Sequence, residues 1–220
     1  MSILNDPKLE GLLAALHAQS KAQDALTEEY WRTRSGPWNG MEARDHAHYA
    51  DKFVALEPDK AEFCYAICRA NGARRIVEVG TSFGVSTLYL AAAVRDNGGG
   101  TVIATEYEPG KVRVARDNFA TAGLSAFIDL REGDVRETLK NIDGPIDFVL
   151  FDIWADMVGP VLALLLPHLR AGAVICTDNS AGERARANYK LLFDAIADPR
   201  NRLITQTLPF TGGLEMTVRI

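Results

Sequence analysis

Short β-branched runs alternate with helical stretches from Arg75 onward, and no other feature limits the fold as strongly. The runs are apolar on both faces, as in Ile146–Phe151. Strands of this kind, separated by helices, form a parallel sheet of right-handed βαβ units. We expect strands at Ile76–Val79, Thr101–Thr105, Ala126–Leu130, Ile146–Phe151 and Ala173–Thr177, and helices at Ser86–Val94, Pro109–Ala122, Val135–Asn141, Val158–Leu169 and Arg184–Ile196.

The end of the chain follows a different pattern. Two further strands, Leu203–Leu208 and Leu214–Ile220, have only five residues between them. Five residues cannot hold a crossover helix, so this pair is predicted to be an antiparallel hairpin. The expected fold class is α/β, a seven-stranded Rossmann-like sheet of five parallel strands plus the hairpin, with helices on both faces. Residues 1–56 are expected to form a helical extension and residues 57–220 the sheet domain, and Asp6 and Pro7 predict the start of the first helix.

Composition excludes several classes of function. The chain has 220 residues and a formal net charge of −5, which disfavours a nucleic-acid partner because phosphate binding needs a basic surface. Its apolar runs are too short to span a bilayer, and Met1–Pro7 does not read as a secretory signal. Three cysteines are an odd number and fit a reducing compartment, so we expect a cytoplasmic protein without a membrane partner.

Acidic residues follow nearly every expected strand. They are Glu106, Asp134, Asp152 and Asp178, and Asp178 is followed by Asn179. In an open α/β sheet ligands bind beyond the carboxyl ends of the strands, so these side chains are predicted to line a binding site. Turns and helix N-caps also favour Asp and Asn, which explains any single position better than all of them together.

The loop after the first strand suggests a cofactor. Gly80 and Gly84 form G-x-x-x-G and lack the middle glycine that a dinucleotide loop needs to approach a pyrophosphate. Glu106 ends the second strand, where an acid accepts the hydroxyls of a ribose. A glycine loop without a phosphate design, together with acidic walls, fits S-adenosylmethionine, whose sulfonium is cationic, better than NAD.

A cation site is predicted where the fourth and fifth strands end. The oxygens of Asp152, Asp178 and Asn179 can converge there from adjacent strands. Ligation by oxygen alone suits Mg²⁺ or another hard divalent ion rather than zinc.

The sequence from Glu57 to Ile220 resembles the cation-dependent, S-adenosylmethionine-dependent O-methyltransferases, the group of catechol and caffeoyl-coenzyme A O-methyltransferases. The segments that carry the resemblance are VEVGTSFGVSTLYLA (Val77–Ala91), TEYEPGKVRVARDNFATAGL (Thr105–Leu124), REGDV (Arg131–Val135), DFVLFDIW (Asp147–Trp154), LRAGAVICTDN (Leu169–Asn179) and the final GGLEMTVRI.

The resemblance implies a role for each matching position. Asp152, Asp178 and Asn179 hold the cation, and Asp152 and Asn179 are the expected catalytic residues. The acceptor is a small, hydroxylated, aromatic molecule that chelates the cation, and a homodimer is expected by analogy. The residues expected to bind S-adenosylmethionine are Glu78, Gly80, Thr81, Ser82, Gly84, Ser86, Glu106, Asp134, Val135 and Asp152.

One position departs from the family pattern. A lysine usually stands three residues after the first metal Asp, and here that position is Ala155. The metal alone could activate the acceptor, another base such as His46 or His48 could replace the lysine, or the chain could bind the cofactor with little or no methyl transfer. A cofactor-binding protein of the same fold is therefore the alternative function, and a nicotinamide oxidoreductase is a weaker third one.

Overall fold

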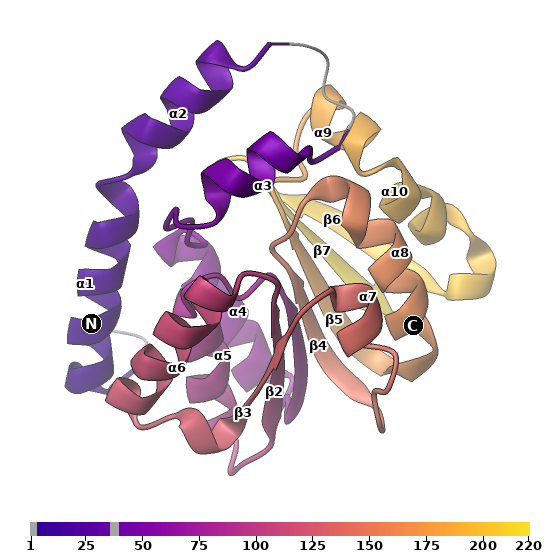
Figure 1. Cartoon of the computed structure of the whole chain (residues 1–220). Coiled ribbons are helices and arrows are strands. Elements are labelled where there is room, and N and C mark those ends of the chain that lie inside the picture. Colours follow the sequence, from indigo (N-terminus) through magenta and orange to yellow (C-terminus); the bar gives the residue numbers. More distant parts are fainter. Residues whose placement is uncertain (1–3, 36–39) are drawn as a thin grey trace.

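The computed structural model describes residues 4–35 and 40–220. Its centre is a seven-stranded sheet with strand order β3-β2-β1-β4-β5-β7-β6, covered by helices on both sides (Figure 1). The predicted fold class is confirmed. The strands are β1 Arg75–Val79, β2 Thr101–Glu106, β3 Ile128–Glu132, β4 Ile146–Phe151, β5 Leu169–Asp178, β6 Leu203–Leu208 and β7 Leu214–Arg219.

Strand pairing follows the predicted division of the sheet. β1 pairs in parallel with β2 and β4, β2 with β3, and β4 with β5. β7 is antiparallel to both β5 and β6, with Cys176 opposite Met216 and Ile204 opposite Val218. Parallel strands end at the same edge, so the loops after β1 to β5 meet there.

Alternate residues of the buried strands face two separate cores. Ile76 of β1 joins the core under α4 (Pro58–Ala70), α5 (Val85–Asp96) and α6 (Pro109–Ala122). Its neighbour Val77 joins the opposite core, under α7, α8 and α10. The helices of that second face, and the short α9 beside them, are α7 Val135–Thr138, α8 Ala155–Leu165, α9 Glu183–Asn188 and α10 Lys190–Ala197.

Several boundaries differ from the sequence prediction, and the helix expected at Val158–Leu169 is α8, Ala155–Leu165, because Leu169 already begins β5. The single helix expected at Arg184–Ile196 is two helices, α9 and α10, divided at Tyr189, whose hydroxyl donates to the carbonyl oxygen of Asp178 at 2.9 Å. The helix expected from Val135 ends at Thr138, where the Arg131 guanidinium donates to the Thr138 carbonyl at 2.8 Å. In addition, β3 covers residues 128–132 rather than 126–130, and β5 begins at residue 169 rather than 173.

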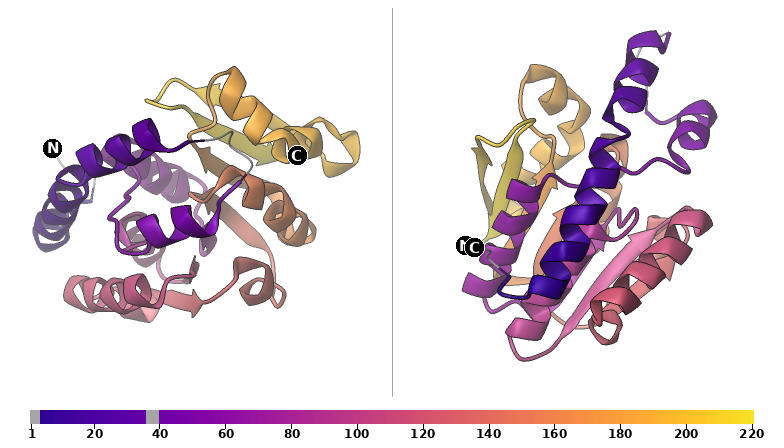
Figure 2. Two further views of the ribbon diagram at one scale, coloured as in Figure 1. Left: turned by 45° about the horizontal axis from the view of Figure 1, so that its top comes forward. Right: turned by 90° about the vertical axis from the view of Figure 1, so that its left-hand side faces the viewer.

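The N-terminal segment packs on the first core instead of forming one of its own. α1 (Pro7–Lys21) begins as predicted, with Asp6 Oδ1 accepting from the Leu9 N–H at 3.2 Å, and it buries three leucines against the sheet core. α2 (Asp24–Thr33) continues along the same side, and α3 (Ala43–Tyr49) lies near the strand ends (Figures 1 and 2). The boundary at residue 56 stays a prediction, and residues 1–3 and 36–39 lie outside the described chain. No helix of the described ranges has the length and apolar character of a membrane span.

Candidate active site

A cavity of about 1070 Å³ opens at the carboxyl ends of the parallel strands. Loops after all five of these strands line it, together with side chains of α2 and α3. The structure therefore brings together the strand-end residues that the sequence singled out. Those that line the cavity are Gly80, Ser82, Glu106, Asp134, Val135, Asp152, Asp178 and Asn179.

Four of the residues expected to bind the cofactor do not line this cavity. Glu78 belongs to β1, Thr81 and Gly84 to the loop that follows it, and Ser86 to the first turn of α5. Thr81 donates to Glu78 Oε2 at 2.9 Å, Thr87 donates to the same oxygen, and Ser86 lies close to the carboxylate without the geometry of a full hydrogen bond. The hydrogen bonds to Glu78 indicate that these residues stabilise the conformation of the loop.

Gly80 lets β1 and β4 approach each other closely at the cavity floor. Its φ of +100° is one that side chains rarely adopt, and a Cβ there would lie 2.0 Å from the carbonyl oxygen of Asp152. The Asp152 N–H in turn donates to the Val79 carbonyl at 2.9 Å. Glycine at this position therefore determines where Asp152 enters the site.

Three backbone N–H groups orient the Glu106 carboxylate. Ser82 donates to Oε2 at 2.7 Å, while Tyr107 and Glu108 donate to Oε1 at 2.8 and 2.9 Å. Burial raises the pKa of Glu106, and these donors oppose that shift by stabilising the charged form. The result is a fixed acceptor after β2, as ribose binding requires.

Asp134 after β3 behaves differently. It caps α7 by accepting from the Arg136 N–H at 2.8 Å, and it pairs with the Arg136 guanidinium at 2.6 Å. That pairing lowers the pKa of Asp134. Both residues line the cavity, and Val135 beside them is buried.

Asp152, Asp178 and Asn179 meet at the far side of the cavity from Glu106, after β4 and β5. Asn179 has a φ of +54°, and its Nδ2 donates to Asp178 Oδ2 at 2.6 Å. The turn of the C-terminal hairpin supports this amide, because a Cβ on Gly212 would lie 2.3 Å from Asn179 Oδ1. Burial raises the pKa of Asp152 well above its ordinary value, and the neighbouring Asp178 charge raises it further.

A fourth residue, which the sequence reading missed, belongs to this group. Lys60 of α4 is 1% exposed, and its Nζ lies 2.5 Å from Asp178 Oδ1 and 2.9 Å from Glu57 Oε2. Burial raises the pKa of Asp178 to about 6, and the Lys60 charge opposes the shift. The sequence signal was a lysine on the same helical face as Ala61, Cys64 and Cys68, where an unpaired charge would be costly.

Aromatic side chains form the wall of the cavity above these acids. Trp154 contacts Tyr49 edge-on, with ring centroids 5.0 Å apart, and lies 6.5 Å from Trp31. The Trp31 Nε1–H donates to the Tyr49 hydroxyl at 2.6 Å. All three line the cavity, so flat apolar surface lies beside the carboxylates.

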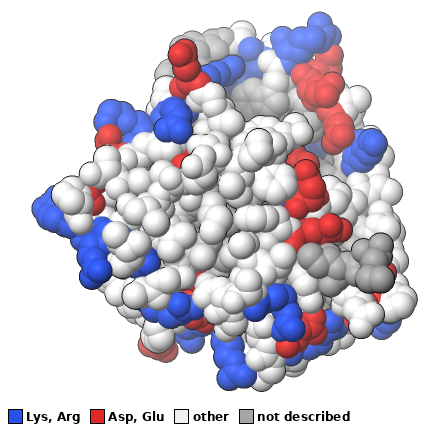
Figure 3. Space-filling model, turned by 180° about the vertical axis from the view of Figure 1, so that it is seen from behind, with Lys and Arg blue, Asp and Glu red and all other residues white. Residues whose placement is uncertain are grey.

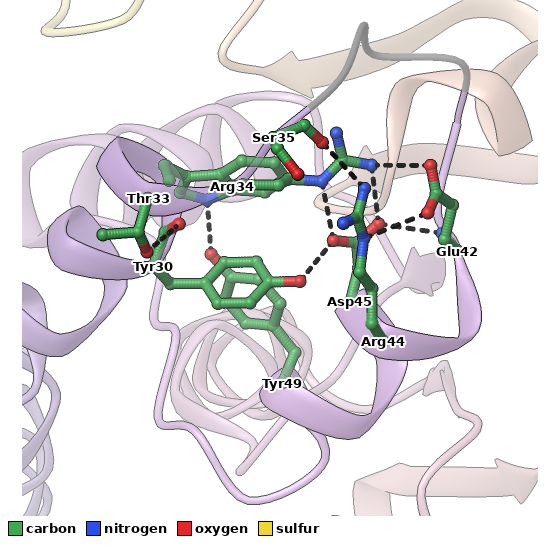
Figure 4. Close-up of polar contacts among 9 residues, drawn as sticks. Tyr30, Thr33, Arg34, Ser35, Glu42, Arg44, Asp45 and Tyr49 are labelled. Atoms are coloured by element: carbon green, nitrogen blue, oxygen red, sulfur yellow. Dashed lines mark hydrogen bonds and ion pairs between the residues drawn. The ribbon is translucent and has the colours of Figure 1, made fainter.

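A buried ion pair ties α2 to α3 behind this wall. Arg34 donates to Asp45 at 2.8 and 3.0 Å and to Glu42 at 3.2 Å, and the Tyr30 hydroxyl also donates to Asp45 (Figure 4). The Arg34 guanidinium holds the pKa of Asp45 well below its usual range. This network fixes the position of Tyr49 one helical turn further along.

The two histidines offered as alternative bases are in different places. His46 lines the cavity, with its ring 6.2 Å from that of Tyr107. His48 stacks on Tyr30 at 3.9 Å between centroids and does not line the cavity. Ala155 also lines the cavity, at the start of α8. Of the two histidines, only His46 can face an acceptor.

Comparisons with known proteins agree with this geometry. Residues 77–180 match the family model described as a methyltransferase domain. The chain is 32% identical over 127 residues to a catechol O-methyltransferase of Mycobacterium tuberculosis, and 28% identical over 130 residues to one of Niastella koreensis. These alignments cover 57% of this chain, and 57% and 58% of the two relatives, so the chain spans little more than half the length of these relatives.

Solved structures share the whole fold. An O-methyltransferase from Bacillus cereus in complex with SAH (S-adenosylhomocysteine) superposes with a TM-score of 0.71 at 22% identity, covering 98% of this chain and 92% of that one. The O-methyltransferase TomG of Streptomyces achromogenes, in complex with S-adenosylmethionine, gives 0.67 at 21% identity, covering 80% and 86%. At such identities the likeness establishes the fold.

The sheet order and the strand-end cavity therefore define a protein with the methyltransferase fold. Within that class the chain is similar to S-adenosylmethionine-dependent O-methyltransferases, with catechol O-methyltransferases among its relatives. The resemblance stated from the sequence is confirmed.

Proposed function

We propose that this chain transfers a methyl group from S-adenosylmethionine to an oxygen of a small aromatic acceptor that chelates a divalent cation. The observation that carries the proposal is the order of groups across the cavity. The fixed carboxylate of Glu106 lies after β2, Asp152 follows two strands further on, and the aromatic wall of Trp31, Tyr49 and Trp154 covers the acids. The catechol O-methyltransferase relatives support this acceptor class.

The residues around Asp178 fit a hard divalent ion. Within residues 4–35 and 40–220 the Asp152 carboxylate accepts no hydrogen bond, although it is largely withdrawn from water beside a second acid. Asp178 and the amide oxygen of Asn179 would complete a donor set of oxygens, as Mg²⁺ prefers. The described chain contains no group of three or more His, Cys, Asp and Glu side chains suited to a metal, so the set depends on the amide and on the acceptor's own oxygens. A cation bound there would lower the pKa of the acceptor hydroxyl.

The protein's part in the reaction is orientation. The acceptor oxygen attacks the methyl carbon in line, the new C–O bond forms as the C–S bond breaks, and S-adenosylhomocysteine leaves. Glu106 would hold the ribose, and the wall of Trp31, Tyr49 and Trp154 would hold the acceptor ring, so that the two reacting atoms meet at a fixed angle. His46, which lines the cavity, is a candidate to take the hydroxyl proton.

A methyl-transfer screen tests the proposal. Vicinal diphenols and matched monophenols would be incubated with S-adenosylmethionine, with Mg²⁺ or with EDTA, and products measured by mass spectrometry. We expect methylated diphenols only in the incubations that contain Mg²⁺. Calorimetry should show S-adenosylhomocysteine binding both with Mg²⁺ and with EDTA. Turnover that survives exhaustive chelation would remove the cation from the proposal.

The alternative is a cofactor-binding protein that does not transfer methyl groups. Two observations favour it: Ala155 replaces the usual lysine, and Lys60 already pairs with one of the two carboxylates of the proposed cation site. It predicts tight binding of S-adenosylhomocysteine and no product from any diphenol.

The binding partners of the chain and its cellular compartment are predicted from the sequence. The face shown in Figure 3 carries charged side chains of both signs around a middle with few of them, and no broad basic patch. This arrangement supports a small-molecule acceptor over nucleic acid for that face. The homodimer and the cytoplasmic location stay predictions.

A further inference from the structure

Lys111 is a buried cation that the reaction described above does not use. It lies in the first turn of α6 and is 7% exposed, and it lines the cavity. Within the described residues it forms no hydrogen bond and no ion pair, and its nearest described contact is the Phe83 ring, 5.6 Å from Nζ to the centroid. Burial lowers the pKa of Lys111, and the charges of nearby acids, Glu106 foremost, oppose that shift without cancelling it.

The position of Lys111 relates it to the loop after β1. Phe83 stands directly before Gly84, the N-cap of α5, and Phe53 stacks on it at 4.5 Å. The ammonium therefore lies near the start of a helix of 12 residues, where unpaired N–H groups and the helix dipole favour an anion. A buried cation and a helix N-terminus together indicate a negatively charged ligand group.

The other cations of the cavity are in different positions. Arg136 is paired with Asp134 after β3. Arg184 lies in the first turn of α9, after β5, and two strands separate β5 from β2 in the sheet. Of the cationic side chains that line this cavity, Lys111 is the one in the first turn of the helix after β2, with its ammonium over Phe83 of the β1 loop.

S-adenosylmethionine carries charges that match this arrangement. Its sulfonium and α-ammonium are cations suited to the acids of the cavity, and its α-carboxylate is the single anion. The side chain of Ser86, which the family resemblance assigned to the cofactor, lies near Glu78 in the first turn of α5 and does not line the cavity. The carboxylate therefore needs a different side-chain partner in this chain.

We propose that Lys111 binds the α-carboxylate of S-adenosylmethionine and selects the intact amino-acid end of the cofactor. The inference rests on the proposed function, because it takes the cofactor to lie with its ribose at Glu106. The carboxylate would sit between the Lys111 ammonium and the first N–H groups of α5, and Phe83 would exclude water from one side. Charge-assisted hydrogen bonds of this kind are stronger than neutral ones.

Two ligands that differ only in the carboxylate provide the test. Calorimetry would compare S-adenosylhomocysteine with its decarboxylated analogue, 5′-deoxy-5′-(3-aminopropylthio)adenosine, on wild type, Lys111→Met and Lys111→Arg. The control is Lys140→Met, which removes one exposed lysine charge. We expect Lys111→Met to weaken S-adenosylhomocysteine binding about 10- to 100-fold and to leave binding of the analogue unchanged. Lys111→Arg should keep most of the affinity.

Three results would overturn the inference. The first is an equal loss of affinity for both ligands in Lys111→Met. The second is an unchanged affinity of Lys111→Met for S-adenosylhomocysteine, and the third is the same loss of affinity in Lys140→Met. Thermal unfolding of each variant shows whether the fold is intact, and Lys111→Arg carries the test if Lys111→Met does not fold. A wild type that binds S-adenosylhomocysteine but methylates no acceptor contradicts the proposed function and leaves the assignment of Lys111 standing.

Discussion

The Lys60 ammonium and the Asp178 carboxylate form an ion pair inside the protein, 2.5 Å apart, between α4 and the end of β5. The lysine is 118 residues away in sequence, and its other partner is Glu57. One positive charge therefore sits beside the two acids that end β4 and β5. The proposed cation site is thus already partly neutralised by the protein itself.

Replacing Lys60 by methionine should destabilise the protein and increase its response to Mg²⁺. Loss of one partner of a buried pair leaves Asp178 uncompensated, at a cost of about 3–5 kcal/mol in the free energy of unfolding. Urea unfolding in EDTA and in Mg²⁺ measures this, and we expect the metal to restore part of the loss. Lys190→Met, on an exposed pair with Asp194, is the control and should change stability by less than about 1 kcal/mol. Equal effects of the two variants would contradict the structural role of Lys60.

Gly80→Ala should prevent the close approach of β1 and β4. The added Cβ meets the Asp152 carbonyl, and the backbone conformation is itself unfavourable for alanine, so a loss above about 3 kcal/mol is expected. Gly110→Ala is the matched control because a Cβ there meets nothing within 4 Å and lies in a helix. It should be neutral or stabilising by about 0.5–1 kcal/mol, as thermal or urea unfolding will show.

Glu78 makes stability depend on pH. Burial raises its pKa from 4.5 to about 7, so the folded protein holds a proton that the unfolded chain releases. The contribution of Glu78 to stability is therefore largest below pH 4.5 and falls as the pH rises to about 7, by about 3 kcal/mol in all. In Glu78→Gln this slope should disappear, so the variant should gain that amount relative to wild type between pH 4.5 and 8. Urea unfolding across this range tests the prediction, with Glu137→Gln, an exposed position, as control; parallel curves for wild type and Glu78→Gln would exclude it.

Trp154→Ala should weaken acceptor binding without affecting the cofactor. The indole contacts Tyr49 and faces the cavity, so its removal takes away one side of the aromatic wall. Steady-state kinetics with a diphenol should show a KM about tenfold higher, the size of a lost aromatic contact with its buried area. The Kd of S-adenosylhomocysteine should stay the same. If both constants rise together, Trp154 supports the fold rather than the acceptor.

Ala155→Lys tests whether the missing lysine limits the reaction. Ala155 begins α8 on the cavity surface, so a lysine there can reach the acceptor oxygen beside Asp152. We expect a higher kcat with a diphenol and an unchanged KM for S-adenosylmethionine. An unchanged kcat would show that this chain activates its acceptor without a lysine at that position, and His46→Gln would then be the next variant to measure.

The sheet was predictable because its strands are decided by local pattern. The last four residues of β4, Phe148–Phe151, are apolar and buried on both faces of the sheet. The predicted bounds of this strand match the structure. The division of α9 from α10 was not predictable, because it depends on the bond from Tyr189 to the backbone of Asp178, a contact between separate elements. The early start of β5 likewise follows from an irregular register with β4 near Ile146.

The site was predictable only where its residues follow strands. Glu106, Asp152 and Asp178 could be placed because parallel strands end at one edge of the sheet. Lys60 and Lys111 lie on helices, and the apolar face that Lys60 shares does not by itself show which partner its ammonium meets. Their burial is a result of packing between α4, α6 and the sheet, which hydrophobic periodicity does not encode.

The aromatic wall is largely built by residues that precede the first strand. Trp31 and Tyr49 belong to α2 and α3, whereas the acids beneath them belong to the sheet loops. Changes in one short segment can therefore alter which molecule is accepted and leave the strand-end acids untouched. Two homologues that share every acid of the sheet need not share an acceptor, and substrate range can diverge in this lineage faster than its chemistry.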